Sequence, residues 1–382
     1  MNNETNNNNA TVPPSGGGGG TRIIIAGGGT GGHIFPAVAI ANAIKKIEPG
    51  TEFLFVGAKG KMEMEKIPQA GYKIEGIDIA GFNRSSLIKN IGLPIKLIKS
   101  FIQVRKIFKA FRPDAVIGVG GYSSFPVLRF AQAKRIPTFI HESNSFAGKS
   151  NIMLGKKATR IFVASQGMEK FFPANRIQVT GNPVRASISE SKLSREEGIR
   201  FFGLDPAKKT ILSVGGSLGA LKINEALDKN LDAFEQNGLQ LIWQTGKPYA
   251  EKGKQRGAGR TNLWVNDFIT QMEYAYAAAD LVISRSGAMA IAELSVMRKP
   301  AIFVPYPHAA EDHQTANAQS LVNKQAGIMV KDNEALETLV DTVIALSKDE
   351  EKQAELKKNI AAFAVHDADT VIAKEILTGL KK

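Results

Sequence analysis

The 382-residue sequence contains no cysteine, which excludes disulfide bonds, thiolate metal sites and cysteine nucleophiles. It also has no uninterrupted apolar run of the roughly 18–20 residues that a membrane-spanning helix requires. Residues 1–20 are rich in Asn, Pro and Gly, so we expect a disordered leader that is neither a signal peptide nor an anchor. With 43% hydrophobic and 22% charged residues, the chain is typical of a globular protein with two domains.

Acidic residues are scarce in the first half of the chain. Residues 22–184 contain 24 Lys and Arg but only 9 Asp and Glu, a net charge of +15, whereas residues 185–382 contain 25 and 26, a net charge of −1. This asymmetry predicts an anionic partner on the first half, either nucleic acid or an anionic membrane surface. The chain shows no aromatic-rich strand set, zinc motif or basic recognition helix, so the sequence favours no nucleic acid as a partner.

The basic excess is concentrated between Ile79 and Pro113, where eight Lys and Arg occur without an acid. Apolar residues interleave with them at spacings of three and four, which predicts a helix with an apolar stripe flanked by cations, as in helices that lie on a membrane surface. The alternative is an ordinary amphipathic helix packed on its own sheet. We expect part of the stripe to be core, and the preceding loop to touch lipid through Phe82, Leu87, Ile88 and Ile91.

Short runs of β-branched and aromatic residues alternate with longer amphipathic segments along the chain. This alternation predicts parallel strands joined by helices, hence a doubly wound α/β fold. The expected buried strands are residues 23–25, 53–56, 115–117, 138–140, 161–163, 211–214, 241–243, 281–283 and 301–304. Gly181 and Pro183 end the first half. We therefore place the domains at residues 21–184 and 185–366, and expect residues 367–382 to return to the first domain.

A glycine-rich loop follows the first expected strand and precedes a helix: Gly27-Gly28-Gly29-Thr30-Gly31-Gly32-His33. Glycines allow the backbone to approach phosphate closely, and the helix N-terminus supplies unpaired N–H groups. The loop satisfies G-x-G-x-x-G, so a nicotinamide-dependent oxidoreductase is one interpretation. That signature also needs an acid at the end of the second strand, where this chain has Gly57-Ala58-Lys59, and its absence weakens the dehydrogenase interpretation.

Other polar and glycine-rich turns follow further strands. They are Gly120-Gly121-Tyr122, His141-Glu142-Ser143-Asn144 and Gly215-Gly216-Ser217-Leu218-Gly219-Ala220. Together with the loop at residues 27–33, the turns at residues 120–122 and 215–220 make three glycine-rich turns that follow strands, two in the first half and one in the second. This arrangement predicts a ligand held in the crevice between the two halves. The imidazole of His141 and the amide of Asn144 suit hydrogen bonds to sugar hydroxyls. The alternative is that Asn144 or Ser145 caps a helix.

Glu293 lies in an otherwise apolar helical segment that begins near Gly287. An unpaired buried carboxylate is costly, so we expect Glu293 either to bind a ligand, such as the two hydroxyls of a nucleotide ribose, or to pair with Arg298. Further along the chain, His308, Asp312 and His313 could bind a metal ion. Their spacing, however, matches no standard helical pair of metal ligands.

The order of these motifs resembles that of one family. The segments that carry the resemblance are Gly27–Ala37, His141–Asn144, Gly181–Arg185, Gly215–Ala220, Arg285–Glu293 and His308–Asn317. They resemble the MurG family, bacterial glycosyltransferases that add N-acetylglucosamine to the lipid-linked muramyl-pentapeptide precursor of peptidoglycan. The resemblance runs from about Arg22 to the C-terminus, and the leader is not part of it.

The resemblance implies a GT-B fold, in which two Rossmann-like doubly wound parallel-sheet domains face a central cleft. It also implies an inverting transfer from UDP-N-acetylglucosamine to the 4-hydroxyl of undecaprenyl-pyrophosphoryl-muramyl-pentapeptide, without a cofactor, at the cytoplasmic face of the cell membrane. This step serves cell-wall synthesis, and with it cell shape and division. By motif position, the substrate-binding residues would be Thr30, Gly31, Gly32, Asn144, Arg185, Ser217, Ile269, Ala288, Met289, Glu293 and Gln314, and the acceptor side would carry Tyr122 and His141.

His33 is the candidate general base, because an imidazole titrates near neutral pH, and Glu142 is the other contender. Alternatively, His33 caps the first helix or orients substrate. No Asp-x-Asp metal motif stands at a suitable strand end, since we expect Asp367-Ala368-Asp369 to begin a helix, so the mechanism requires no metal ion. The alternative activity is that of another GT-B UDP-sugar glycosyltransferase acting on a membrane lipid such as diacylglycerol.

Overall fold

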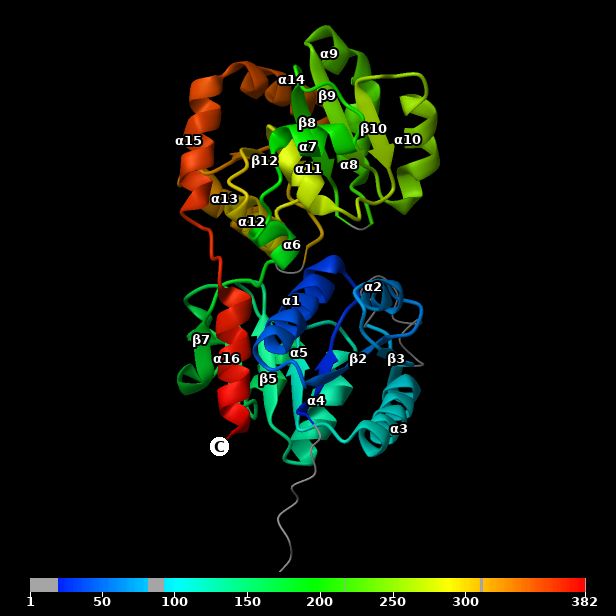
Figure 1. The fold of residues 1–382 in the computed structure, drawn as a ribbon, viewed down its shortest axis with the longest axis vertical. Helices are drawn as coiled ribbons and strands as arrows, with labels where there is room; N and C mark the ends of the chain where they lie inside the picture. Colours follow the sequence, from blue (N-terminus) through cyan, green and yellow to red (C-terminus); the bar gives the residue numbers. More distant parts are fainter. Residues whose placement is uncertain (1–19, 82–92, 217, 310–311, 382) are drawn as a thin grey trace, which may run out of the picture.

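The computed structural model describes residues 20–81, 93–216, 218–309 and 312–381. Three predicted features lie outside these residues: the leader up to residue 19, the donor contact Ser217, and the lipid-contact candidates Phe82, Leu87, Ile88 and Ile91. The chain forms two α/β domains that follow one another along the long axis of the molecule (Figure 1).

The N-terminal domain is built on a seven-stranded parallel sheet in the order β3-β2-β1-β4-β5-β6-β7. Its strands are β1 (Arg22–Ala26), β2 (Glu52–Ala58), β3 (Ile74–Ile77), β4 (Ala115–Gly118), β5 (Thr138–Glu142), β6 (Arg160–Val163) and β7 (Ile177–Val179). Its helices are α1 (Gly31–Ile47), α2 (Glu63–Gln69), α3 (Leu93–Phe111), α4 (Ser124–Ala133), α5 (Lys149–Gly155) and α16 (Ala368–Leu380). Apolar residues fill both faces of the sheet, under α1 and α16 on one face and under α3 and α4 on the other.

The C-terminal domain repeats this plan with a six-stranded parallel sheet in the order β10-β9-β8-β11-β12-β13. Its strands are β8 (Lys209–Val214), β9 (Leu239–Gln244), β10 (Leu263–Asn266), β11 (Leu281–Ser284), β12 (Ala301–Phe303) and β13 (Ile328–Met329). Its helices are α6 (Ala186–Ser189), α7 (Arg195–Phe201), α8 (Leu221–Lys229), α9 (Leu231–Gln236), α10 (Ala250–Gly257), α11 (Met272–Ala278), α12 (Ala288–Val296), α13 (His313–Val322), α14 (Ala335–Lys348) and α15 (Glu350–Ala361). Short 3₁₀ turns occupy Met168–Lys170, Ala174–Arg176 and Lys247–Tyr249.

All nine predicted buried strands are confirmed, and the four strands that the sequence analysis missed are β3, β7, β10 and β13. These four are the edge strands of the two sheets. An edge strand has a neighbour on one side only, so its residues are less uniformly apolar than those of a central parallel strand. In β3 and β7, for example, Glu75 and Gln178 interrupt the apolar residues.

The chain order reverses beside the first strand of each sheet, between β1 and β4 and between β8 and β11. In doubly wound sheets, ligands bind outside the carboxyl ends of the strands at such a reversal. The glycine-rich loops at residues 27–32 and 215–219 directly follow β1 and β8. Both loops therefore stand at the positions where this architecture binds ligands.

The chain passes between the domains twice, after β7 and after α15 (Figure 1). The two connections touch, because a Cβ atom added at Gly181 would lie 2.8 Å from the Val365 side chain. Gly181 also has a φ angle of 78°, a conformation that favours glycine. After the second connection, α16 packs against α1 of the N-terminal domain.

Candidate active site

The first glycine-rich loop passes close to its neighbours and leads directly into α1. Gly28 donates its N–H to the Gly120 carbonyl at 3.2 Å, which joins this loop to the turn after β4. A Cβ atom at Gly28 would lie 2.3 Å from the Glu63 carboxyl carbon, so no larger residue fits there. Thr30 is the N-cap residue of α1, and the first turn of the helix includes Gly31 and Gly32. The unpaired backbone N–H groups of this turn therefore lie next to the carboxyl end of β1.

Glu63, the first residue of α2, is a residue of the site that the sequence analysis missed. Its side chain is 1% exposed and accepts two backbone hydrogen bonds, from Gly29 N–H at 2.7 Å and from Ala58 N–H at 2.9 Å. One carboxylate therefore connects the glycine-rich loop to the end of β2. The dinucleotide signature seeks an acid at the strand end itself, whereas this acid stands five residues later on a helix that turns back. The sequence signal that could have identified Glu63 is an acidic residue shortly after the second strand.

His33, on the first turn of α1, has one ring nitrogen fixed and one available. Its Nδ1 atom lies 3.0 Å from the Gly28 carbonyl oxygen. Because a carbonyl only accepts hydrogen bonds, Nδ1 carries a proton, and the neutral ring has its lone pair on Nε2. The ring packs against Gly120, where a Cβ atom would lie 2.8 Å from Nε2. The half-buried imidazole is thus oriented by the glycine-rich loop itself.

Glu142, at the end of β5, uses its carboxylate to hold the following loop. Oε1 accepts hydrogen bonds from the backbone and side-chain N–H groups of Asn144, and Oε2 accepts from Gly148 N–H and from the Asn151 side chain, at distances of 2.9–3.3 Å. The side chain is 4% exposed. These contacts hold Asn144 in the loop that follows β5. The helix that follows begins only at Lys149, so the alternative that Asn144 or Ser145 caps it is wrong.

His141 and Tyr122 were both expected on the acceptor side, and their exposure differs strongly. His141 is fully buried, and its Nδ1 atom lies 3.4 Å from the Ser143 hydroxyl. Burial lowers its pKa to about 4, although the Gly181 backbone opposes the shift, so the ring is neutral near pH 7. Tyr122 is 56% exposed, with its ring over Gly81. Only Tyr122 can therefore contact a ligand without a rearrangement.

Arg185 and Glu293, both predicted to bind the donor, lie together at the domain junction. Arg185 Nη2 is 3.2 Å from Glu293 Oε1, and the Tyr276 hydroxyl donates to Glu293 Oε2 at 2.9 Å. The Arg185 guanidinium also stacks 4.0 Å from the ring of Phe35, which belongs to α1 of the other domain. The alternative of an ion pair between Glu293 and Arg298 is wrong. Burial and the Glu293 charge raise the Tyr276 pKa well above its usual value, so its proton stays available to Glu293.

The second glycine-rich loop is held by Gln244, which the sequence analysis also missed. The side-chain amide of Gln244 donates to the Gly216 carbonyl at 3.1 Å and accepts from Ile269 N–H at 3.0 Å. One amide thereby joins the loop to Ile269, one of the predicted substrate-binding residues. The Ile269 side chain itself is 3% exposed and packs in the apolar core under β8 and β9.

The remaining predicted donor contacts lie at the N-termini of α12 and α13. Ala288 begins α12, and Met289 beside it is 8% exposed. The Gln314 side chain accepts a hydrogen bond from Tyr306 N–H at 3.0 Å, and its carbonyl accepts one from the Ser286 hydroxyl. These bonds tie the start of α13 to the turns that follow β11 and β12.

A pocket of about 310 Å³ opens between the domains near these groups. Ser143, Ser165 and Asn182 line it from the N-terminal domain, and Ala288 and Asn317 line it from the C-terminal domain. The Asn182 amide donates to Ser143 and Ala288 carbonyls, at 3.1 and 3.5 Å, and so bridges the domains. Its oxygen and the Ser165 hydroxyl are buried without a hydrogen-bond partner among the described residues, which leaves two polar atoms for a ligand.

No group of three or more His, Cys, Asp or Glu side chains in the described part of the chain is arranged to hold a metal ion. None of the helices described is both long enough and apolar enough to cross a bilayer.

Comparisons with known proteins agree with this geometry. The glycosyltransferase family 28 N-terminal domain matches residues 23–163, and the family 28 C-terminal domain matches residues 210–372. A protein from Phocaeicola vulgatus is 52% identical over 350 residues, covering 91% of this chain and 93% of its own. A protein from Bacteroides fragilis is 52% identical over 352 residues, with the same shares. Both are named UDP-N-acetylglucosamine–N-acetylmuramyl-(pentapeptide) pyrophosphoryl-undecaprenol N-acetylglucosamine transferase.

Solved structures give the same result. The crystal structure of Acinetobacter baumannii MurG is 28% identical, with a TM-score of 0.70 over 94% of this chain and 99% of that chain. UDP-N-acetylglucosamine 2-epimerase from Neisseria meningitidis is 14% identical, with a TM-score of 0.67 over 94% of this chain and all of that one, and shares the fold. The predicted GT-B architecture is thereby confirmed. From its matches to both family 28 domains and its identity to these transferases, the chain belongs to the MurG family of glycosyltransferases.

Proposed function

We propose that this protein transfers N-acetylglucosamine from UDP-N-acetylglucosamine to the 4-hydroxyl of undecaprenyl-pyrophosphoryl-muramyl-pentapeptide, with inversion at the anomeric carbon. The acceptor oxygen forms the new bond to that carbon, and the bond to the β-phosphate oxygen breaks as UDP leaves with the electron pair. The proton of the acceptor hydroxyl goes to a base. The names and high identity of the relatives support the substrates, and the site geometry supports the chemistry.

The position of His33 is the observation that carries the chemistry. Its Nδ1 proton is engaged by the Gly28 carbonyl, which leaves the Nε2 lone pair free to accept a proton. Glu142 is the weaker candidate, because its carboxylate already accepts hydrogen bonds from Asn144, Gly148 and Asn151. We therefore assign the base to His33 and a positioning role to Glu142, with Asn144 as the group that it presents to the donor sugar.

The leaving diphosphate gains negative charge as the glycosidic bond breaks. The first turn of α1 at Thr30, Gly31 and Gly32, the second glycine-rich loop with Ser217, and the N-terminus of α12 at Ala288 and Met289 supply N–H donors for it. Donors fixed before the reaction stabilise the transition state without a reorganisation cost. The Gln314 side chain is the proposed sugar contact on α13.

The ion pair between Arg185 and Glu293 is the proposed resting state of the nucleotide site. In the complex, Glu293 would accept hydrogen bonds from the two ribose hydroxyls, and Arg185 would turn to the diphosphate. Ile269 would form one wall for the uracil ring through its backbone and neighbours. In this proposal the nucleotide of the donor binds residues 185–366 and the acceptor binds residues 21–184, which also reach the donor diphosphate and sugar through Thr30–Gly32 and Asn144. Residues 367–382 complete the acceptor domain.

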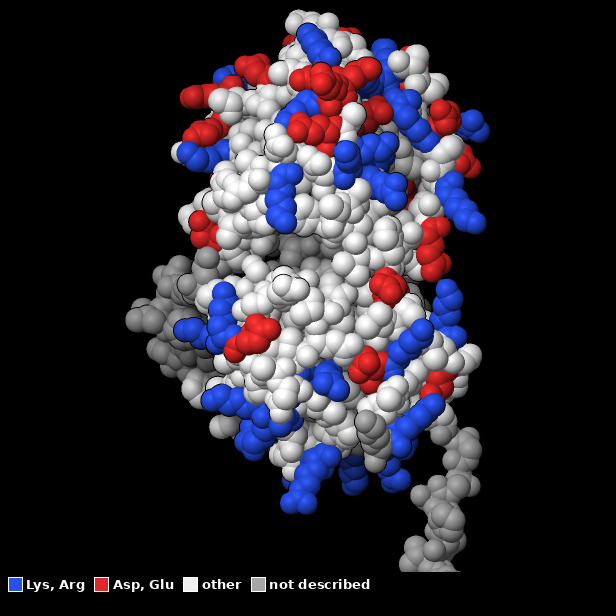
Figure 2. All heavy atoms as spheres, turned by 90° about the vertical axis from the view of Figure 1, so that its left-hand side faces the viewer, with Lys and Arg blue, Asp and Glu red and all other residues white. Residues whose placement is uncertain are grey.

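An anionic membrane surface is the proposed partner of the N-terminal domain. Ile95, Ile98 and Ile102 on α3 are 72, 64 and 55% exposed, and Lys96 and Lys106 are exposed on the same helix. On the face seen in Figure 2, Lys and Arg gather at the lower end of the N-terminal domain, while the C-terminal domain carries both signs. Apolar side chains between cations are typical of helices that lie on a bilayer, which supports peripheral binding at the cytoplasmic face.

The transfer is tested with radiolabelled UDP-N-acetylglucosamine and a water-soluble analogue of the lipid-linked muramyl-pentapeptide. We expect label in the disaccharide product and release of UDP in equal amount. A parallel reaction contains diacylglycerol vesicles as acceptor. Transfer to diacylglycerol in place of the muramyl peptide would favour the alternative activity, and UDP-sugar binding without transfer to either would overturn the proposal.

A further inference from the structure

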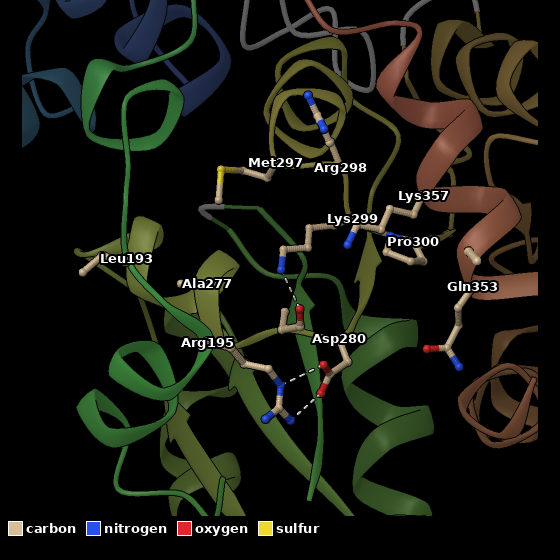
Figure 3. Close-up of a pocket in the computed structure, with 12 residues that line it drawn as sticks. Leu193, Arg195, Ala277, Asp280, Met297, Arg298, Lys299, Pro300, Gln353 and Lys357 are labelled. Carbon is tan, nitrogen blue, oxygen red and sulfur yellow. Dashed lines mark hydrogen bonds and ion pairs between the residues drawn. The ribbon is translucent and has the colours of Figure 1, made fainter. Parts of the chain in front are cut away.

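The C-terminal domain contains a second pocket that the proposed reaction does not use. It has a volume of about 410 Å³ and is lined by the segments before β11 and β12, the start of α7 and one side of α15 (Figure 3). These segments lie at the amino ends of the strands, whereas the interdomain cleft lies at their carboxyl ends. We call it the basic pocket and define it by Arg195, Asp280, Arg298, Lys299 and Lys357.

One cation and one anion of the basic pocket neutralise each other. Arg195 donates to both carboxylate oxygens of Asp280, at 2.9 and 2.8 Å, and to the carbonyls of Pro206 and Lys208. Asp280 also accepts Thr210 N–H at 2.8 Å. Figure 3 shows this pair on one wall of the pocket. Its hydrogen bonds are satisfied, so it forms a fixed and nearly neutral surface.

The other three basic residues have no such compensation. No acidic side chain besides Asp280 lines the pocket in the described part of the chain. Lys299 donates to the Ala279 carbonyl at 2.8 Å, which uses one of the three donors of an ammonium group. Figure 3 shows Lys357 reaching from α15 towards Lys299, whereas the side chain of Arg298 points away from both. The pocket therefore concentrates positive charge in a half of the chain whose net charge is −1.

The titration of Lys299 is consistent with a site that lacks its counter-ion. Burial lowers the pKa of Lys299 to about 8, and the positive charges of Lys357 and Arg195 lower it as well, against the raising effect of Asp280. An anion beside the amine would reverse these effects, because it favours the charged form.

We propose that the basic pocket binds a soluble phosphorylated anion, of the class of inorganic pyrophosphate or a phosphate monoester. Its volume lies within the roughly 300–1,000 Å³ of small-molecule sites. Lys357 supplies a charged donor at the rim and Lys299 supplies its two remaining donors at the base, while the exposed Arg298 side chain would turn inward to add its guanidinium. Guanidinium and ammonium groups form the strongest hydrogen bonds that proteins make to phosphate oxygens.

The basic pocket and the donor site lie at opposite ends of α12. Ala288 at the start of this helix lines the interdomain pocket, and Met297, directly after its last residue, lines the basic pocket. Nine helical residues span about 13 Å at 1.5 Å per residue, so one diphosphate cannot occupy both sites. Saturation of the cleft with UDP therefore leaves the basic pocket open.

The test titrates inorganic pyrophosphate into UDP-saturated protein by calorimetry at pH 7. The variant R298G/K357Q removes two exposed side chains, and glycine readily adopts the φ of 52° found at Arg298, so we expect it to fold normally. The control K254Q/K348Q removes the same charge from exposed positions elsewhere in the domain. We expect one pyrophosphate per chain with similar affinity in wild type and control, and binding at least tenfold weaker in R298G/K357Q. Equal affinity in all three proteins, or no binding to the wild type at millimolar pyrophosphate, would overturn the proposal.

Two further arms identify the contact and the source of the anion. At pH 8, the wild type should take up more protons on binding than K299M, which appears as a stronger dependence of the binding enthalpy on buffer ionisation enthalpy. Equal proton uptake by the wild type and K299M would show that Lys299 does not contact the anion. Phosphatidic acid vesicles should bind R298G/K357Q as they bind the control. If vesicle binding were lost in R298G/K357Q alone, and the wild type bound no pyrophosphate, the assignment to a soluble ligand would be overturned.

Discussion

The two domains share one topology but anchor their glycine-rich loops with different side chains. In the N-terminal domain, the Glu63 carboxylate accepts N–H groups from Gly29 and Ala58. In the C-terminal domain, the Gln244 amide donates to the Gly216 carbonyl and accepts from Ile269 N–H. Both anchors are buried, and both connect the loop after a central strand to the neighbouring segment. The same structural task is thus performed by an anion in one domain and by a neutral group in the other.

Electrostatics explain this difference. A carboxylate beneath the second loop would repel the diphosphate that we propose to bind there, whereas an amide leaves the positive potential of the backbone N–H groups unopposed. The N-terminal domain tolerates the negative charge of Glu63 because residues 22–184 carry a net charge of +15. We propose that the first loop serves both the acceptor and the diphosphate, whereas the second loop serves the diphosphate alone, and the following experiments test that division.

The largest expected effect is on the base in the N-terminal domain. H33A should lower turnover by about 10²–10⁴-fold, because it removes proton transfer from the acceptor hydroxyl, while the affinity for UDP stays unchanged. Steady-state kinetics and UDP titration measure the two quantities. H366A, a substitution at an exposed histidine, is the matched control and should retain full activity. A loss of less than about tenfold in H33A would refute the base assignment.

Acid should destabilise the N-terminal domain first, because His141 is the buried histidine of the described chain. Its pKa is lowered from 6.5 to about 4 in the folded state, so as the pH falls through this window the unfolded chain gains a proton that the folded chain does not. The free energy of unfolding should therefore fall by about 3 kcal/mol between pH 6.5 and 4. Hydrogen exchange resolved by domain measures this loss. In H141N the pH dependence should flatten, and an unchanged slope would point to other groups.

Membrane binding should depend on the cations of one domain only. K96Q/K106Q should weaken binding to phosphatidylglycerol vesicles by roughly 2 kcal/mol, about thirtyfold, at about 1 kcal/mol per cation near an anionic surface. Sedimentation with vesicles of increasing anionic content measures the partition coefficient. K254Q/K348Q removes equal charge from the C-terminal domain and should bind as the wild type does. Binding that ignores salt and lipid charge would exclude the electrostatic contribution.

The two loop anchors should differ in the kinetic parameter that they affect. E63A leaves the N–H groups of Gly29 and Ala58 without their acceptor and should lower kcat by about tenfold, since an unsatisfied buried group costs about 1–3 kcal/mol. Q244A should instead raise the KM for UDP-N-acetylglucosamine by a similar factor. Full kinetics with both substrates measure the split, and thermal unfolding reports any general loss of stability. E63Q keeps one acceptor oxygen and should recover part of kcat. The same kinetic change in both variants would contradict the division between the loops.

Much of the fold follows from local sequence patterns. The central strands are continuous apolar runs, because both faces of a doubly wound sheet are covered by helices. The glycine-rich loops were recognisable because close backbone approaches, such as that of Gly27 to the Gly120 carbonyl, require glycine in any such fold. Among the edge strands, β3 and β7 were missed because Glu75 and Gln178 interrupt their short apolar runs, and β13 because it has only two residues.

The partners of the site residues were less predictable. The sequence required Glu293 to find a partner, and Arg298 was one candidate. The partner is Arg185, which is 108 positions away along the chain, while Arg298 follows the end of α12 and lines the basic pocket. Glu63 and Gln244 escaped notice for the same reason, because their function consists of contacts to loops that only the folded sheet brings near.

The family, the two-domain α/β architecture, the glycine-rich loops and the confinement of the positive charge to the first half were all legible in the amino-acid sequence. Each of these depends on residue type and short-range order, which a linear chain displays. The tertiary structure alone decided which ring nitrogen of His33 is free, that His141 is buried, that Glu142 holds a loop, and that three cations gather in the basic pocket. Those properties arise from distances between segments far apart in the chain, and parallel-sheet crossovers set these distances only on folding.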